Sequence, residues 1–190
     1  MGCDIHAFLE YKNNDGVWED ANIFEFDNYD QAFQIMDVYD GRDYELFAVL
    51  ANVRNDNGNR PISEPRGVPD DVSGNIKEEI KKWDCDGHSH SYYTLRELLD
   101  YTKPKKKLKR AGFMTPENAD KVDAGGQPNE WWQSGNIPNQ QYREWERPDN
   151  SIREFISQIK QHWKIKHKYC DDEDINKIAD RIRIVFFFDN

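Results

Sequence analysis

Two histidines one residue apart, His88 and His90, are the strongest chemical signal in this sequence. The same short segment contains three other polar side chains, Asp86, Ser89 and Ser91. On an extended segment, side chains two residues apart point to the same side, so both imidazoles are expected to face one site. There they could act as general base and general acid in the cleavage of a phosphodiester, with Asp86 beside them.

The opening of the chain adds two candidate ligands, Asp4 and His6. The alternation of residues 3–11 predicts a strand on which both side chains share a face. Imidazole nitrogens and carboxylate oxygens together suit zinc, manganese or iron. One hypothesis is therefore a divalent-metal site formed by Asp4, His6, His88 and His90, in which the metal activates a water. A metal-free acid and base pair fits the same residues, and a hydrogen-bonded structural role is the alternative for His6.

Arginines and aromatic residues elsewhere in the chain suit a phosphorylated ligand. Guanidinium groups bind phosphate oxygens in pairs, and aromatic rings stack on bases. The candidate ligand-binding residues are Arg42, Arg54, Asn55, Glu64, Arg66, Ser89, Ser91 and Tyr92. With Tyr93 and the tryptophans of residues 111–150, they could form a pocket that captures a nucleotide-like molecule without cleaving it. The other two histidines, His162 and His167, are expected on the surface.

Charge and composition narrow the class of protein. The net charge of -10 argues against a general nucleic-acid binder, because such proteins neutralise phosphates with a basic surface. No apolar run approaches the roughly 18 residues of a membrane span, and no secretory leader is apparent, so a cytoplasmic location is expected. Three scattered cysteines without a C-x-x-C pair indicate neither a disulfide framework nor a zinc knuckle.

Periodicity and capping signals predict an α+β fold. The expected strands are residues 3–11, 17–19 and 181–190, the first two forming a hairpin and the last a central strand. The expected helices are residues 42–53, 73–83, 94–101, a helix from 151 onward, and 171–180. Ser73 is expected to cap its helix, and Thr94 with Glu97 and Ser151 with Glu154 match capping boxes.

The remaining segments are predicted to be irregular. Residues 20–41 are interpreted as loop with a short irregular element, and residues 60–71 as a rigid, proline-rich extended loop. The basic block 103–110 is either a solvated loop or a phosphate-binding segment. Residues 102–150 are expected to form a long irregular, aromatic-rich excursion that acts as a lid or an oligomer contact.

Together these elements predict a single domain over residues 1–190. Its small, mostly antiparallel sheet is expected to join the N- and C-terminal strands, with several helices packed on it. Because the tryptophans of the excursion need something to cover them, we expect a homo-oligomer.

Five segments of the chain also resemble a known group of proteins. They are M-G-C-D-I-H at residues 1–6, the helical segment 42–55, I-S-E-P-R-G-V-P-D-D at 62–71, D-G-H-S-H-S at 86–91 and R-I-V-F-F-F-D-N at 183–190. They are similar to a family of small uncharacterised phage and prophage proteins. The resemblance implies an accessory phage protein, and by analogy one that acts against host defence in the host cytosol.

Three functions are therefore compatible with the sequence. The protein could hydrolyse a phosphodiester bond of a nucleotide-like molecule, or sequester a nucleotide immune signal such as a cyclic dinucleotide or a cyclic ADP-ribose. It could also inhibit a protein partner, for example as an acidic mimic of DNA.

Overall fold

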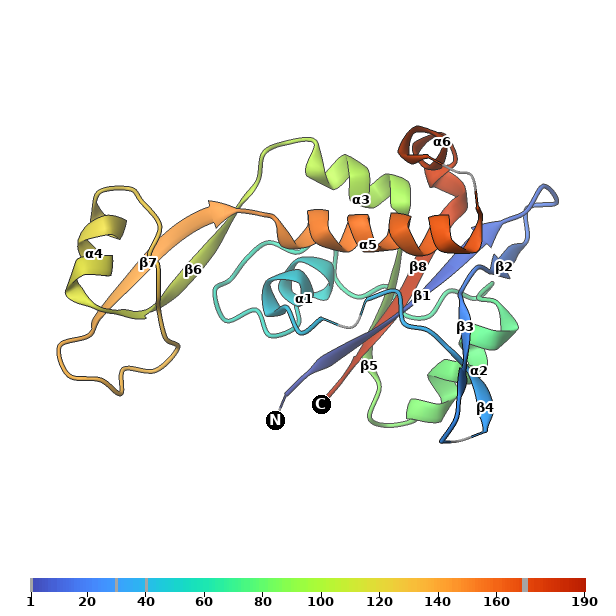
Figure 1. Cartoon of the computed structure of the whole chain (residues 1–190), viewed down its shortest axis with the longest axis horizontal. Helices are drawn as coiled ribbons and strands as arrows, with labels where there is room; N and C mark the ends of the chain where they lie inside the picture. Colours follow the sequence, from blue (N-terminus) through green and yellow to red (C-terminus); the bar gives the residue numbers. More distant parts are fainter. Residues whose placement is uncertain (1, 30, 40, 169–170) are drawn as a thin grey trace.

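The computed structural model describes residues 2–29, 31–39, 41–168 and 171–190. At its centre is an antiparallel four-stranded sheet in the order β2-β1-β8-β5. The four strands are β1 (Asp4–Lys12), β2 (Trp18–Asp20), β5 (His88–Thr94) and β8 (Ile182–Asp189). Strands β1 and β8 pair along almost their whole length, so the two ends of the chain lie side by side (Figure 1). The predicted α+β fold, with a sheet that joins both terminal strands, is confirmed.

Strand β8 is central because both of its faces are apolar. All of its residues from Ile182 to Phe188 are buried. One face carries Ile184 and Phe186, and the other carries Val185 and Phe187. Since successive strand residues point to opposite faces, this near-continuous apolar run requires cover on both sides of the sheet.

Helices provide that cover on both faces. The first face packs against the helices α1 (Tyr44–Ala51), α3 (Leu95–Thr102), α5 (Ser151–Lys166) and α6 (Asp172–Lys177), the last followed by a 3-10 turn (Ala179–Arg181). The second face packs against α2 (Gly74–Trp83). These helices agree with the predicted ones to within a few residues at most of their ends. Across the residues described, no helix is both long enough and apolar enough to cross a membrane.

Of the three predicted helix caps, Thr94 with Glu97 is confirmed, Ser73 is confirmed in position only, and Ser151 is wrong. Thr94 and Glu97 form a reciprocal capping box at the start of α3. Ser151, in contrast, is already the first helical residue of α5, and the Asp149 carboxylate instead accepts a first-turn N–H. Ser73 occupies the N-cap position of α2, but the described structure gives its side chain no capping hydrogen bond. At Ser151 the spacing of residue types matched the motif, but the helix begins one residue earlier than the motif requires.

Arg183 is the polar exception in β8. Its guanidinium is buried, with Nε 2.7 Å from Glu10 Oε2 and Nη1 2.7 Å from Asp71 Oδ1. It also lies 4.2 Å from the centre of the Trp18 ring. A buried guanidinium with two carboxylate partners is compensated in charge and fixed in position. This network ties the end of the rigid loop 60–71 to the second face of the sheet.

Residues 20–41 contain a hairpin where a loop was predicted. Strands β3 (Phe24–Asp27) and β4 (Ala32–Ile35) pair antiparallel outside the main sheet. The Phe26 and Phe33 rings meet edge to face at 5.3 Å, and both are largely exposed. Strands this short give too few alternating positions for their period to stand out among the surrounding acidic residues.

From residue 107 the chain leaves the main body as an arm, which projects to one side in Figure 1. Strands β6 (Lys107–Met114) and β7 (Gln141–Pro148) pair antiparallel, with α4 (Pro116–Asp123) between them in sequence. A small core of the arm's own contains Met114, Ala119, Val122 and Trp145. The excursion is therefore more regular than predicted, and the second half of the basic block forms the start of β6. The two strands were not predicted because each one pairs with a segment far along the chain.

Candidate functional site

The two histidines of β5 do not point to the same side of the strand. The register of β5 against β8 shifts at this point, where Ser89 has a φ of 52°. The His88 ring stacks on Phe188 at 6.1 Å, whereas the His90 ring stacks on Phe187 at 5.2 Å. Because Phe187 and Phe188 point to opposite faces, this bulge separates the two imidazoles. The expectation that both would face one site is wrong.

His6 takes the place beside His90 that was expected for His88. It lies on β1, the other neighbour of β8, and its ring stacks on Phe187 at 5.0 Å. Trp83, at the end of α2, lies 4.1 Å from the His6 ring and 6.0 Å from the Phe187 ring. We call His6, His90, Trp83 and Phe187 the histidine cluster. It belongs to the second face of the sheet.

The environments of His6 and His90 move their pKa values in opposite directions. Burial opposes protonation of His6, but carboxylates on two sides outweigh it and raise the pKa: Asp37 is 3.6 Å from Nδ1, and Asp189 is 3.7 Å from Nε2. Burial, with His88 nearby, lowers the pKa of His90. Groups pushed apart in this way can serve as a protonated acid and a neutral base at the same pH.

The four predicted metal ligands are not assembled into a metal site. Asp4 forms a bidentate ion pair with Arg42, with Nε 2.8 Å from Oδ1 and Nη2 2.5 Å from Oδ2, which lowers the pKa of the carboxyl group. His88 Nδ1 lies 3.0 Å from Ser89 Oγ, on the other face from His90. Among the residues that the structure describes, no group of three or more histidine, cysteine or acidic side chains is arranged to hold a metal ion.

The rigid loop 60–71 runs beside β5, and its Arg66 has a structural role. Arg66 Nη1 lies 2.8 Å from Glu97 Oε1, and the guanidinium lies 4.4 Å from the Tyr93 ring centre. The backbone N–H of Arg66 donates to Ser91 Oγ at 3.2 Å. The other predicted residues of this region are also outside the pocket described next. They are the exposed Glu64 and Asp86 and the half-buried Ser89 and Tyr92.

His162, which was predicted to lie on the surface, is buried. Its Nε2 accepts the backbone N–H of Ile23 at 3.1 Å, and burial lowers its pKa to about 4. His167 is half-buried and stacks on Trp163 at 4.0 Å. Both histidines are therefore part of the packing around α5.

A pocket of about 690 Å³ lies where the arm meets the main body. Its walls come from α1, from the turn at residues 54–59 and from the strands and connecting loop of the arm. The lining residues are Arg42, Asp43, Tyr44, Glu45, Ala48, Arg54, Asn55, Asp56, Asn57, Asn59, Arg110, Ala111, Gly112, Trp131, Gln133, Tyr142 and Arg147. We call this the arginine pocket. It contains three of the predicted ligand-binding residues, Arg42, Arg54 and Asn55.

A buried carboxylate, Glu45, joins α1 to both strands of the arm. Arg110 on β6 and Arg147 on β7 each form an ion pair with it, and Arg147 Nε lies 2.8 Å from Oε2. Burial would raise the pKa of Glu45, but the two guanidinium groups outweigh that effect and lower it. The carboxylate therefore stays ionised and fixes the arm against the helix.

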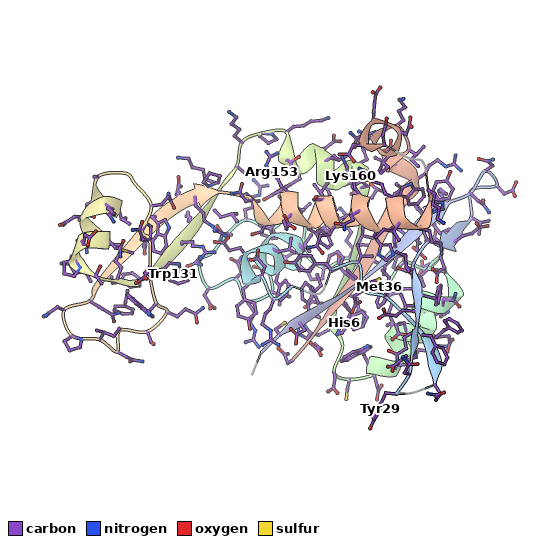
Figure 2. The ribbon with its side chains drawn as sticks, viewed as in Figure 1. His6, Tyr29, Met36, Trp131, Arg153 and Lys160 are labelled. Atoms are coloured by element: carbon purple, nitrogen blue, oxygen red, sulfur yellow. The ribbon has the colours of Figure 1, made fainter. Side chains whose placement is uncertain are left out.

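Charged side chains of both signs line the arginine pocket, and a further carboxylate, Asp4, pairs with Arg42 from outside the lining. Its four arginines face three carboxylates, of which Asp43 accepts two N–H groups at the start of α1. Two aromatic side chains complete the lining: Trp131 lies 5.0 Å below the Arg110 guanidinium, and Tyr142 is 51% exposed. Figure 2 shows the labelled Trp131 well away from the labelled His6, so the pocket and the histidine cluster are separate sites.

Trp131 is one of the tryptophans that were expected to help form a pocket, but several other residues of the arginine pocket were not predicted. Arg110 lies in the basic block, and Trp131 and Tyr142 lie in the aromatic excursion, so composition had marked their segments. Glu45 and Arg147 carried no such signal. They are 102 residues apart in sequence, and only the docking of the arm brings them together.

Comparisons with protein-family models, with curated proteins and with solved structures found no match to this chain. A functional proposal therefore rests on the side-chain geometry of the two sites.

Proposed function

We propose that this protein binds a small phosphorylated, nucleotide-like molecule in the arginine pocket. The observation that carries the proposal is that one cavity of about 690 Å³ combines four guanidinium groups with the rings of Trp131 and Tyr142. A guanidinium group can donate two parallel hydrogen bonds to the oxygens of one phosphate, and an exposed aromatic ring offers a stacking surface for a base. Pockets that enclose small ligands have volumes of about 300–1,000 Å³, so the size is suitable.

The ion pairs of the pocket do not prevent phosphate binding. Arg42 pairs with Asp4, but both side chains are about half exposed, at 53% and 47%. Exposed ion pairs contribute little to stability because water screens them. A phosphate group can therefore replace the Asp4 carboxylate on Arg42, while the buried pairs of Glu45 keep the pocket in shape.

Capture without cleavage is the form of this function that the geometry favours. None of the five histidines, all of which are in the described part of the chain, lines the arginine pocket. The proposal is thus a protein that sequesters a nucleotide signal of the cyclic dinucleotide or cyclic ADP-ribose type. A counter-defence role in the cytosol of a phage-infected cell follows from the resemblance to phage proteins and is part of the proposal.

Calorimetric titration with a panel of adenine nucleotides, cyclic dinucleotides and cyclic ADP-ribose isomers tests binding. We expect at least one to bind, and Tyr142→Ala and Arg42→Gln each to weaken it about tenfold or more, the loss of roughly one good contact. Tyr29→Ala, a tyrosine 94% exposed on the β3–β4 hairpin, is the matched control for the first change. Arg143→Gln, which breaks a bidentate Arg–Asp pair on the arm, is the control for the second. Equal affinity in the pocket variants and their controls would contradict the proposal.

Hydrolysis at the histidine cluster is a second candidate. It is favoured by the opposite pKa shifts of His6 and His90 on either side of Phe187. In this version protonated His6 is the general acid and neutral His90 the general base. If chromatography shows products, His90→Gln should abolish them and His167→Gln should not. If the ligand is recovered intact after heat denaturation of the complex, capture alone remains.

A further inference from the structure

A second pocket lies next to the arginine pocket. Its volume is about 450 Å³, and its lining residues are Asn59, Arg60, Pro61, Ile62, Tyr101, Lys106, Lys107 and Leu108. Asn59 lines both pockets, so they adjoin at that residue. The lining includes three cationic side chains and no carboxylate. We call it the lysine pocket.

The wall between the two pockets is held by hydrogen bonds. Asn59 is buried, its Oδ1 accepts the Lys109 N–H at 2.8 Å, and its Nδ2 donates to the Lys109 carbonyl at 3.1 Å. Its own N–H donates to Asn55 Oδ1 at 2.8 Å. These bonds fix the turn against β6, and Pro61 restricts the backbone that follows. Arg60, between them, is therefore held at the mouth of the lysine pocket.

Lys106 packs against an aromatic ring in this pocket. The Lys106 ammonium lies 3.3 Å from the centre of the Tyr101 ring, and Tyr101 is itself hydrogen-bonded to the buried Asp149. Burial lowers the pKa of Lys106, the Asp149 carboxylate opposes that shift, and the Arg60 guanidinium adds a smaller lowering. Three cationic side chains that line one concave surface form a site that an anion would stabilise.

The spacing along β6 separates the two groups of cations. Lys107 belongs to the lysine pocket and Arg110 to the arginine pocket. At about 3.3 Å per residue of strand, their backbones lie about 10 Å apart. One phosphate group in the arginine pocket therefore does not also reach the cations of the lysine pocket, whereas a longer ligand can reach both. Lys107 is held there by an exposed ion pair with Glu146 at 3.7 Å, which an anion can replace.

We propose that the lysine pocket is a second phosphate subsite, and that the ligand of this protein is a dinucleotide whose two phosphate groups occupy the two pockets. This inference rests on the proposed function, because it takes the arginine pocket as the first subsite. It adds the requirement that the ligand carry two phosphates with a nucleoside between them.

Calorimetric titration with two linear probes tests the inference: adenosine monophosphate, and the 5′-phosphorylated dinucleotide pApA. We expect the protein to bind pApA at least about tenfold more tightly than the mononucleotide, the gain from roughly one added charge-assisted contact. The double variant Arg60→Gln and Lys106→Gln should lose that preference and keep its affinity for the mononucleotide. Lys105→Gln is the control, since Lys105 belongs to the same basic block but does not line the pocket.

The other possible outcomes exclude either the second subsite alone or both binding pockets. Equal affinity for the two probes, or a preference for pApA that survives the double variant, removes the second subsite and leaves the arginine pocket standing. Absence of binding by both probes at millimolar concentration removes the proposed function for adenine nucleotides and this inference with it. The changed side chains are all exposed, so no loss of folding is expected to obscure the result.

Discussion

The histidine cluster and the arginine pocket are held together by different forces. The cluster is built on neighbouring strands of the central sheet, where β1 and β5 both pair with β8 and α2 closes over them. The arginine pocket is built from a helix, a turn and an arm that meet only through side chains such as Glu45 and Asn59. In the histidine cluster, hydrogen bonds between strand backbones fix the positions of the residues. In the arginine pocket, ion pairs and hydrogen bonds between side chains fix them.

This difference has a consequence for substitutions. A change of charge in the histidine cluster should alter protonation and leave the fold in place, because hydrogen-bonded strands keep their spacing regardless of one side chain. A change of charge in the arginine pocket should loosen the arm, because a buried ion pair that loses one partner leaves the other uncompensated.

The largest effect is expected for Glu45→Gln. It leaves Arg110 and Arg147 partly buried without a counter-charge, so the free energy of unfolding should fall by about 3–5 kcal/mol. Urea unfolding measures this change, and hydrogen exchange should show that the loss centres on β6 and β7. Asp123→Asn, which breaks the exposed pair with Arg143, should leave the unfolding midpoint nearly unchanged. If both variants unfold like the unmodified protein, ion pairs do not hold the arm.

A smaller effect is expected for Gly112→Ala. The added Cβ would lie 2.6 Å from the Trp131 ring and 2.8 Å from the Trp132 carbonyl oxygen, so the indole that lines the pocket must shift. Overpacking of this kind costs about 1–3 kcal/mol, and tryptophan fluorescence and ligand affinity should change with it. Gly74→Ala is the control, because a Cβ there meets nothing within 4 Å. An unchanged affinity in Gly112→Ala would show that Trp131 does not contribute to binding.

The smallest effect on stability is expected in the histidine cluster and is best seen by NMR titration. The His6 pKa should lie above the reference of about 6.5 and the His90 pKa below it. The stability from His6 is thus fully present below the unfolded pKa and is lost as pH rises through the higher folded pKa. The contribution of His90 to stability has the opposite pH dependence, because the fold favours its neutral form. It is present above the unfolded pKa and is lost as pH falls through the lower folded pKa.

Asp37→Asn tests the cause of the His6 shift. Removing this carboxylate should lower the His6 pKa and leave the His90 pKa in place, since Asp37 acts on His6 through a direct contact. Asp15→Asn, in the exposed turn before β2, is the control. An unshifted His6 in the Asp37 variant would mean that Asp189 alone sets its protonation.

Local signals predicted most of the main sheet and its helices. The alternation of β1, the apolar run of β8, the apolar stripe of α1 and the capping box at Thr94 all depend on residues close in sequence. The same reasoning did not assign β5 to the main sheet, and it missed the β3–β4 hairpin and the two strands of the arm. Those strands are short or polar, and their pairing partners supply the order that their own sequence does not show.

The types of side chain in the candidate site could be predicted from the sequence, but most of the individual residues could not. Arginine and aromatic side chains indicated a phosphorylated ligand, and Arg42, Arg54 and Asn55 do line the pocket. Arg66 was selected for the same reason, yet it is occupied by Glu97 and the Tyr93 ring. Residue type alone does not show whether a guanidinium faces a cavity or a neighbouring element.

The sequence by itself determined which arginine, aromatic and histidine side chains this protein has, and it indicated three of the four strands of the central sheet. Tertiary structure decided the rest. A bulge at Ser89, with a positive φ on a residue that is not glycine, sends His88 and His90 to opposite faces and leaves His90 stacked on the same phenylalanine as His6. Docking of the arm on Glu45 brings together arginines 65 and 102 residues away from it in sequence. Propensity and periodicity act over a few neighbouring residues, whereas these contacts depend on the register and packing of distant segments.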